Sequence, residues 1–181
     1  MGISILSSGN VKGQIQRRQM KHYTSYYANY GNIPKDYMCI GISRTCPDWL
    51  TGNISNFSFF RHNVLAPSEF LLSEYKAGKV SEEEYKKIYI TELLNSIQTE
   101  LHEKDIPTWL DKVDNFYAHE CSSKWDAVVF MCYEAPHQFC HRHLFRRLLT
   151  NVYHIPCEEY GVRPTEVWGD IPKVQASKEL F

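Results

Sequence analysis

Residues 127–132 are Ala-Val-Val-Phe-Met-Cys, an apolar run without a charged side chain. A short run of this kind is typical of a strand that is buried on both faces of a parallel sheet. A loop from Glu134 to Phe139 follows, and a helix is expected to begin near Cys140. That helix would bury the apolar residues Leu144, Phe145, Leu148, Leu149 and Val152. Residues 127–152 therefore predict one strand–loop–helix unit.

Three further strands are expected, at residues 3–6, 37–42 and 152–156. Between the first two, a helix with rings along one face is predicted by the spacing of Tyr23, Tyr26, Tyr27 and Tyr30. Gly31, Asn32 and Pro34 would end this helix.

Two helix starts carry local capping signals. Ser68 has the residue type of an N-cap, and Gly78 would close the helix that it opens. Ser81 and Glu84 match a capping box ahead of a longer helix. The apolar stripe of this longer helix comprises Tyr85, Ile88, Tyr89, Leu93, Ile97 and Leu101. A shorter helix is expected near 107–118.

Strands that alternate with helices predict a three-layer, Rossmann-like α/β domain with a mostly parallel central sheet. A chain of 181 residues fits a single domain over residues 1–181. Within it, residues 47–66 are expected to form an irregular insertion, and residues 177–181 a frayed tail.

Composition excludes several classes of protein. The net charge of −1 gives no global attraction to nucleic acid or to a membrane surface. No run approaches 18 apolar residues, and the N-terminal residues do not resemble a secretory signal, so we expect a cytoplasmic protein. The six cysteines are then expected to be reduced. The sequence leaves open whether the chain forms a homo-oligomer.

Three loops are expected to meet at one edge of the sheet, because ligands of open α/β folds bind beyond the carboxyl ends of the strands. They are Ser7–Asn10, Ser43–Pro47 and Tyr133–His143. The last loop carries most of the chemistry. A thiol at a helix start, as expected for Cys140, has a depressed pKa, and Arg142 offers donors suited to phosphate or carboxylate. Glu134 is placed to act as a base or to bind a hydroxyl group. The alternative is structural: Cys132 as core filler, Glu134 solvated and Cys140 as a cap.

A family resemblance extends this interpretation. The run Cys132-Tyr-Glu followed by Cys140-His141-Arg142 resembles the signature of the domain of unknown function family 488. Two further stretches support the resemblance: Ile40–Arg44 with Pro47, and the segments Leu65–Glu69 and Tyr89–Leu93.

The resemblance implies a Rossmann-like fold and a polar pocket built from Arg44, Glu134, Cys140, His141 and Arg142. It also implies similarity to nucleotide-associated proteins. Position 42 is apolar where the family usually has an acidic residue before its arginine, which favours binding without turnover.

Together these observations predict that the chain binds a phosphorylated, nucleotide-derived small molecule, such as a nucleotide second messenger or an ADP-ribose derivative. The expected ligand-binding residues are Ser7, Ser8, Gly9, Asn10, Tyr27, Arg44, Cys132, Glu134, Cys140, His141 and Arg142. The two arginines would clamp the phosphate, Glu134 would take a ribose hydroxyl, and Tyr27 would cover the base. Either the protein sequesters this ligand, or it hydrolyses an N-glycosidic or phosphoester bond with Glu134 and Cys140 as catalytic groups.

Three alternatives remain. Zinc ligation could draw on Cys132, His137, Cys140, His141 and His143, with His119 and Cys121 nearby, but their spacing matches no standard motif, and we expect neither a metal nor another cofactor. Covalent catalysis by Cys140 is the second alternative. The third is nucleic-acid binding through the basic and aromatic residues 17–30, which the near-neutral charge disfavours.

Overall fold

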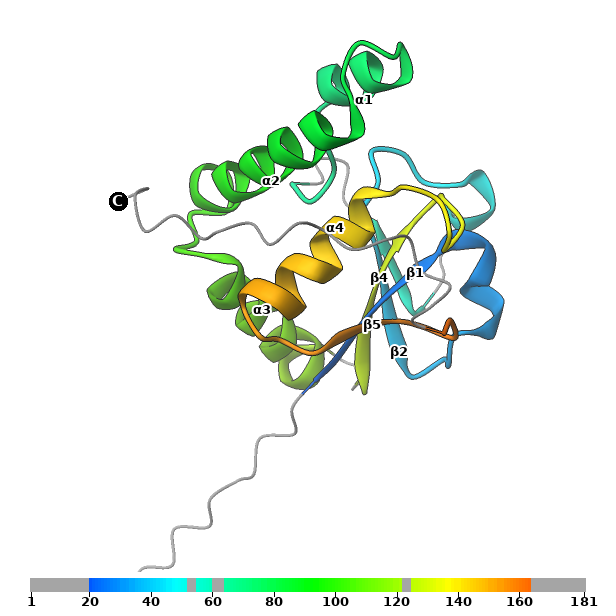
Figure 1. The fold of residues 1–181 in the computed structure, drawn as a ribbon. Coiled ribbons are helices and arrows are strands. Elements are labelled where there is room, and N and C mark those ends of the chain that lie inside the picture. Colours follow the sequence, from blue (N-terminus) through cyan, green and yellow to red (C-terminus); the bar gives the residue numbers. More distant parts are fainter. Residues whose placement is uncertain (1–19, 52–54, 60–63, 122–124, 164–181) are drawn as a thin grey trace, which may run out of the picture.

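The structure, a computed structural model, describes residues 20–51, 55–59, 64–121 and 125–163 (Figure 1). It contains a five-stranded parallel sheet in the order β3-β2-β4-β1-β5. The strands are β1 (Lys21–Tyr26), β2 (Tyr37–Gly41), β3 (Phe57–Phe59), β4 (Ala127–Cys132) and β5 (Cys157–Glu159). The expected α/β class with a parallel sheet is confirmed. The predicted strand 3–6, the loop Ser7–Asn10 and the tail 177–181 lie outside the described residues.

Strand β4 lies at the centre of the sheet and is buried on both faces, and the burial is what its sequence predicted. All six of its residues are buried, because β2 and β1 flank it and both of its faces are covered. Its register aligns Gly41 of β2 with Met131 and Tyr26 of β1 with Cys132. The carboxyl ends of these three strands therefore lie at one edge of the sheet.

The helix predicted from the four tyrosines is wrong. Residues 21–26 form β1, and residues Tyr27–Asn32 form the 3-10 turn η1. Tyrosine and threonine favour strands, and β1 gains a parallel ladder along its whole length with β4 and a shorter one, over His22–Thr24, with β5. Tertiary pairing thus outweighs a spacing that also fits a helix. The continuous aromatic face expected to bind nucleic acid does not form.

Both predicted caps are confirmed. Ser68 accepts a hydrogen bond from the Leu71 amide at the start of α1 (Glu69–Lys76), and Ser81 with Glu84 forms a capping box at the start of α2 (Glu82–Thr99). Gly78 follows α1 with a positive φ of 71°. The remaining helices are α3 (Ile106–Asn115), which continues as the π turn η3 (Phe116–Glu120), and α4 (His141–Arg147), which continues as the π turn η4 (Leu148–Val152).

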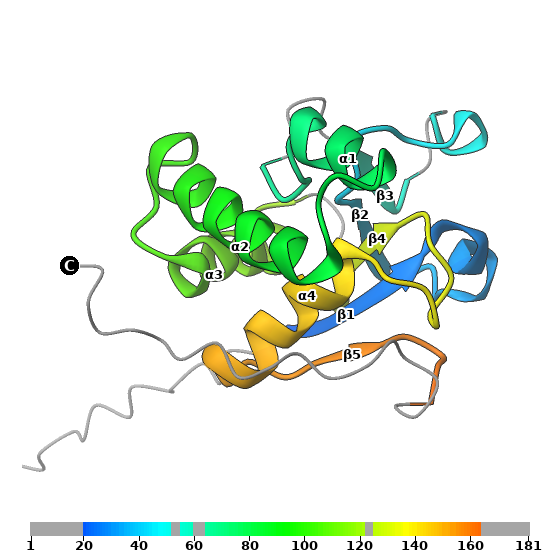
Figure 2. The same cartoon turned by 45° about the horizontal axis from the view of Figure 1, so that its top comes forward.

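Helices α2, α3 and α4 cover one face of the sheet, and η1 lies on the opposite side, which gives three layers (Figures 1 and 2). Because side chains alternate between the two faces of a strand, the sheet separates two hydrophobic cores. Val128 and Phe130 point into the helical core, while Val129 and Met131 point into the second one. The second layer is built from 3-10 turns and aromatic side chains rather than from α-helices. Its buried members are Tyr27, Ile33, Cys39, Leu50, Val129 and Met131.

The structure differs from the sequence-based expectation at the last strand, in the segment 47–66 and at one residue of the α2 stripe. The last strand is Cys157–Glu159 rather than 152–156, because residues 148–152 still belong to the π turn. The segment 47–66 contributes the turn η2 (Asp48–Leu50) and the edge strand β3, whose pairing with β2 has no local sequence signal. Ile88 is 41% exposed, unlike the rest of the α2 stripe. Among the described residues no helix is both long and apolar enough to cross a membrane.

Candidate functional site

The site lies where β2 and β4 end. Cys132 is the last residue of β4, and a loop then leads to Cys140, the N-cap residue of α4. On the neighbouring strand, the Ile42 amide donates to the Met131 carbonyl at 2.8 Å, which extends the ladder one residue beyond β2. The fold thus places the Ile42 carbonyl, the strand end and the helix start side by side.

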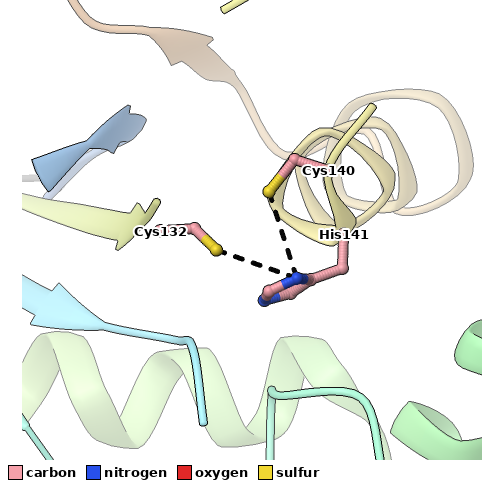
Figure 3. A group of neighbouring side chains, drawn as sticks. All are labelled: Cys132, Cys140 and His141. Carbon is pink, nitrogen blue, oxygen red and sulfur yellow. Dashed lines mark hydrogen bonds between the residues drawn. The ribbon is translucent and has the colours of Figure 1, made fainter. Parts of the chain in front are cut away.

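Four side chains converge there. The Glu134 carboxylate accepts hydrogen bonds through Oε2 from the Cys132 thiol at 3.2 Å and from the Cys140 thiol at 3.0 Å. The His141 Nδ1 atom lies 3.8 Å from the Cys132 sulfur and 4.0 Å from the Cys140 sulfur (Figure 3). Of the predicted group of Cys132, Glu134, Cys140, His141 and Arg142, the first four side chains are therefore in mutual contact. We call these four the cysteine–histidine cluster.

Contacts on the side of the ring away from the two sulfurs fix the orientation of His141. Its Nε2 atom lies 2.8 Å from the Ile42 carbonyl oxygen, and a carbonyl only accepts, so Nε2 carries a proton. The ring also packs edge-on against Tyr89, with centroids 5.5 Å apart. Nδ1 is consequently the atom that faces the two sulfurs.

Electrostatic coupling distinguishes the two thiols. Burial raises the pKa of Cys140, but the hydrogen bond from Cys132 and the charge of His141 outweigh it and hold that pKa well below its ordinary value. Burial and the neighbouring Cys140 raise the pKa of Cys132 well above the ordinary range. For His141, burial lowers the pKa, but the adjacent Cys140 outweighs it and raises the pKa. The cluster thus favours a thiolate at Cys140 beside a protonated His141.

Glu134 completes this coupled group. Burial and the negative charge of Cys140 raise the pKa of its carboxyl. The Cys140 sulfur and the Glu134 oxygen lie 3.0 Å apart and share one proton, so the two groups do not both carry a negative charge. Because Glu134 is only half-buried, it is the member of the cluster that a ligand can approach.

Arg142 has a different place from the one expected. Its guanidinium is fully buried, and Nε donates to Glu159 at 2.9 Å, while Nη1 donates to the Glu134 carbonyl at 2.6 Å. Glu159 also accepts from the Thr24 hydroxyl at 2.5 Å. Arg142 therefore ties α4 to β5, β1 and the site loop, and its charge is paired inside the protein.

Arg44 lies elsewhere. It is exposed, donates to the Pro67 carbonyl at 3.2 Å and forms a 3.8 Å ion pair with Glu69 at the start of α1. The two arginines thus contact separate partners, and the structure does not form the expected joint clamp. Their side chains diverge because Arg142 pairs with a buried carboxylate and Arg44 with Glu69 at the start of α1.

Tyr27 also does not expose its ring at the site. It is 2% exposed within the second core, and its hydroxyl group forms a 2.6 Å hydrogen bond with Ser43. Burial raises its pKa above the ordinary range. The loop Ser7–Asn10 lies outside the described residues, so its part in the site stays a prediction.

Of the residues considered as zinc ligands, the structure gathers Cys132, Cys140 and His141, with one donor atom of each within 4.8 Å of the others. His137 is exposed, and His143 is buried with Nε2 3.8 Å from Glu159. Sequence reasoning missed Glu159, Thr24 and the Ile42 carbonyl. No local signal marks them, since each is brought to the site only by strand pairing.

A comparison with protein families matches most of the described part of the chain. The model for DUF488-N3a, described as the active DUF488-N3 subclade, matches residues 25–152. No curated protein and no solved structure matches the chain. The matched range contains the strands β2 and β4, the loop after β4 and the cysteine–histidine cluster. The chain therefore belongs to the DUF488-N3a family.

Proposed function

We propose that the chain binds a phosphorylated, nucleotide-derived small molecule over the carboxyl ends of β2 and β4 and hydrolyses it, with Glu134 as the general base. The observation that carries the proposal is the position of Glu134. Its carboxylate is oriented by two thiols at 3.2 and 3.0 Å, yet it is only half-buried at the strand edge where open α/β sheets bind ligands. An oriented, accessible carboxylate is what general base catalysis requires.

The family supports turnover rather than sequestration alone, since the subclade that matches is described as active. The apolar residue at position 42 is compatible with this. Ile42 is fully buried in the helical core, and its contribution to the site is the backbone carbonyl that orients His141. This carbonyl is a backbone group, so its contact with His141 does not require an acidic side chain at position 42.

Arg44 supports a phosphorylated ligand. It lies three residues beyond the end of β2, and its exposed ion pair with Glu69, whose side chain is 88% exposed, is weak by its nature. A phosphate group can replace that partner at little cost. Arg142 contributes indirectly, because it holds the Glu134 carbonyl at 2.6 Å and so fixes the loop that presents the carboxylate.

Binding and turnover can be measured separately. A panel of nucleotides, cyclic dinucleotides and ADP-ribose derivatives is screened by thermal shift, and each stabilising compound is then incubated and recovered by chromatography. We expect at least one compound to be both bound and converted. Glu134→Gln should leave binding intact and lower the rate by about 10²–10⁴-fold, the usual contribution of a general base.

Arg44→Ala should lower the affinity for the phosphorylated ligand by about ten- to a hundred-fold, which corresponds to the loss of a charged hydrogen bond. Glu100→Gln, an exposed carboxylate at the end of α2, is the matched control and should change neither measurement. If no compound stabilises the protein, the binding proposal is wrong. If bound compounds are recovered intact, the chain sequesters its ligand and the hydrolytic part is wrong.

A further inference from the structure

We infer that Cys132, Cys140 and His141 bind a zinc ion, with Glu134 beside the fourth coordination position. The three residues come from the end of β4 and the first turn of α4, so two secondary-structure elements fix the ligand set. Their donor atoms point toward a common centre (Figure 3).

The distances fit a tetrahedral metal. Zinc bonds of about 2.3 Å to sulfur and about 2.0–2.1 Å to nitrogen place sulfur and nitrogen ligands about 3.6 Å apart. The His141 Nδ1 atom lies 3.8 Å from the Cys132 sulfur and 4.0 Å from the Cys140 sulfur. These two distances exceed the tetrahedral value by a few tenths of an ångström, and the two sulfurs lie within 4.8 Å of each other, so small side-chain rotations would bring all three atoms into the first coordination sphere.

The histidine is already oriented as a ligand. A metal-bound imidazole usually donates its second N–H group to a carbonyl or carboxylate, which fixes the ring and its tautomer. Here Nε2 donates to the Ile42 carbonyl at 2.8 Å, so Nδ1 is the nitrogen directed at the sulfurs, and its lone pair becomes available to zinc once Nδ1 releases its proton. Since a backbone carbonyl supplies this contact, the orientation is a property of the fold.

The donor types select the metal. Two thiolates and an imidazole suit zinc, whereas magnesium and calcium require oxygen ligands. Cys132, Cys140 and His141 are 2%, 3% and 7% exposed, so the sulfurs are shielded from bulk solvent. The half-buried Glu134 marks the side from which the metal and later a water molecule can enter.

Three protein ligands leave one position open, which is the arrangement of catalytic rather than structural zinc sites. Glu134, already 3.0 Å from the Cys140 sulfur, is next to that position. This part rests on the proposed hydrolytic function. A zinc-bound water molecule would pass one proton to Glu134, the resulting hydroxide would attack the ligand, and Glu134 would return the proton to the leaving group.

The direct test is metal content. The full chain is purified under reducing conditions, its zinc is measured by mass spectrometry, and the metal-free protein is titrated with Co²⁺. We expect one zinc ion per chain. The cobalt form should show the visible absorption of a tetrahedral site and a thiolate-to-cobalt charge-transfer band.

Variants identify the ligands. Cys132→Ser, Cys140→Ser and His141→Gln should each lose the cobalt charge-transfer band or shift it and retain less than a tenth of the zinc. Cys46→Ser, at a half-buried cysteine outside the cluster, should keep both. Circular dichroism of each variant verifies that the fold is intact. Where a variant does not fold, alkylation of the wild type with and without zinc replaces it, and bound zinc should protect Cys132 and Cys140.

Glu134→Gln separates this proposal from the proposed function. It should retain zinc and lose turnover. Absence of zinc and of any cobalt spectrum in reduced wild type would overturn the metal site, as would full metal retention by Cys132→Ser and Cys140→Ser. A zinc-loaded protein that converts no ligand would leave the metal site standing and refute only the hydrolytic function.

Discussion

The buried ion pair between Arg142 and Glu159 offers the sharpest stability test. The side chains are 0% and 1% exposed, and the Glu159 Oε1 atom lies 2.9 Å from both Nε and Nη2 of the guanidinium. The Thr24 hydroxyl occupies the other carboxylate oxygen at 2.5 Å. Glu159→Gln preserves the volume but removes the carboxylate that is paired with the buried guanidinium.

The expected cost follows from that geometry. Removing one partner of a buried pair destabilises proteins by about 3–5 kcal/mol, because the remaining charge is neither solvated nor paired. This is a large part of the roughly 5–15 kcal/mol that stabilises a typical domain. Arg142→Met should cost a similar amount. The double variant should cost less than the sum of the two, by about 0.5–3 kcal/mol.

The same pair predicts a dependence on pH. Burial raises the pKa of Glu159, but the contacts with His143 and Arg142 outweigh it and leave the pKa below its ordinary value. As the pH falls below the unfolded carboxyl pKa of about 4.3, the unfolded chain takes up a proton before the folded chain does. The stability advantage of wild type over Glu159→Gln should therefore be full above about pH 5 and shrink toward acid.

Urea denaturation followed by tryptophan fluorescence and circular dichroism measures these free energies. Lys79→Met, which breaks a surface pair with Glu74 of the same 2.9 Å length, is the control. Its lysine side chain is 64% exposed, and we expect a loss below about 1 kcal/mol. If Glu159→Gln costs no more than this control, or the two single effects add within about 0.5 kcal/mol, the pair is not the buried, coupled contact described here.

Three further predictions concern the core, a cap and a thiol. Ser81→Ala should destabilise the protein by about 1 kcal/mol through loss of the α2 cap, and a stability unchanged in urea melts would contradict the capping role. Phe130→Ala, in the fully buried core, should cost about 3–5 kcal/mol, whereas Phe70→Ala, at a 74% exposed ring, should stay within about 0.5 kcal/mol. Burial raises the pKa of Cys39 to about 12, so iodoacetamide at about pH 8 should label half-buried Cys46 before Cys39. Peptide mapping that finds Cys39 labelled before Cys46 would contradict the buried position of Cys39.

Elements with local signals were predictable. The run at 127–132 formed the central strand because six consecutive apolar side chains can be accommodated only where both faces are covered. The caps at Ser68 and Ser81 were predictable for a related reason, since their hydrogen bonds span three residues. The tyrosine spacing misled because it satisfies a helix locally, whereas strand pairing with β4 and β5 is a long-range contact.

The site divides in the same way. Cys132, Glu134, Cys140 and His141 lie within ten residues, so a strand, a loop and a helix start bring them together without help from distant segments. The direction in which each side chain points could not be predicted from the local sequence. Arg142 follows His141 immediately, yet it turns to Glu159, while Arg44 turns to the start of α1.

By itself the sequence determined the α/β class, the buried central strand and the list of reactive groups that follow it, because apolar runs, caps and short loops act over a few residues. Only the tertiary structure decided the rest. The parallel ladders brought the Ile42 carbonyl to His141 and Glu159 to Arg142, and these two contacts fix which nitrogen faces the sulfurs and which arginine is left for a ligand. Such contacts join residues 17 and 99 positions apart, and their partners are selected by strand order rather than by any local pattern.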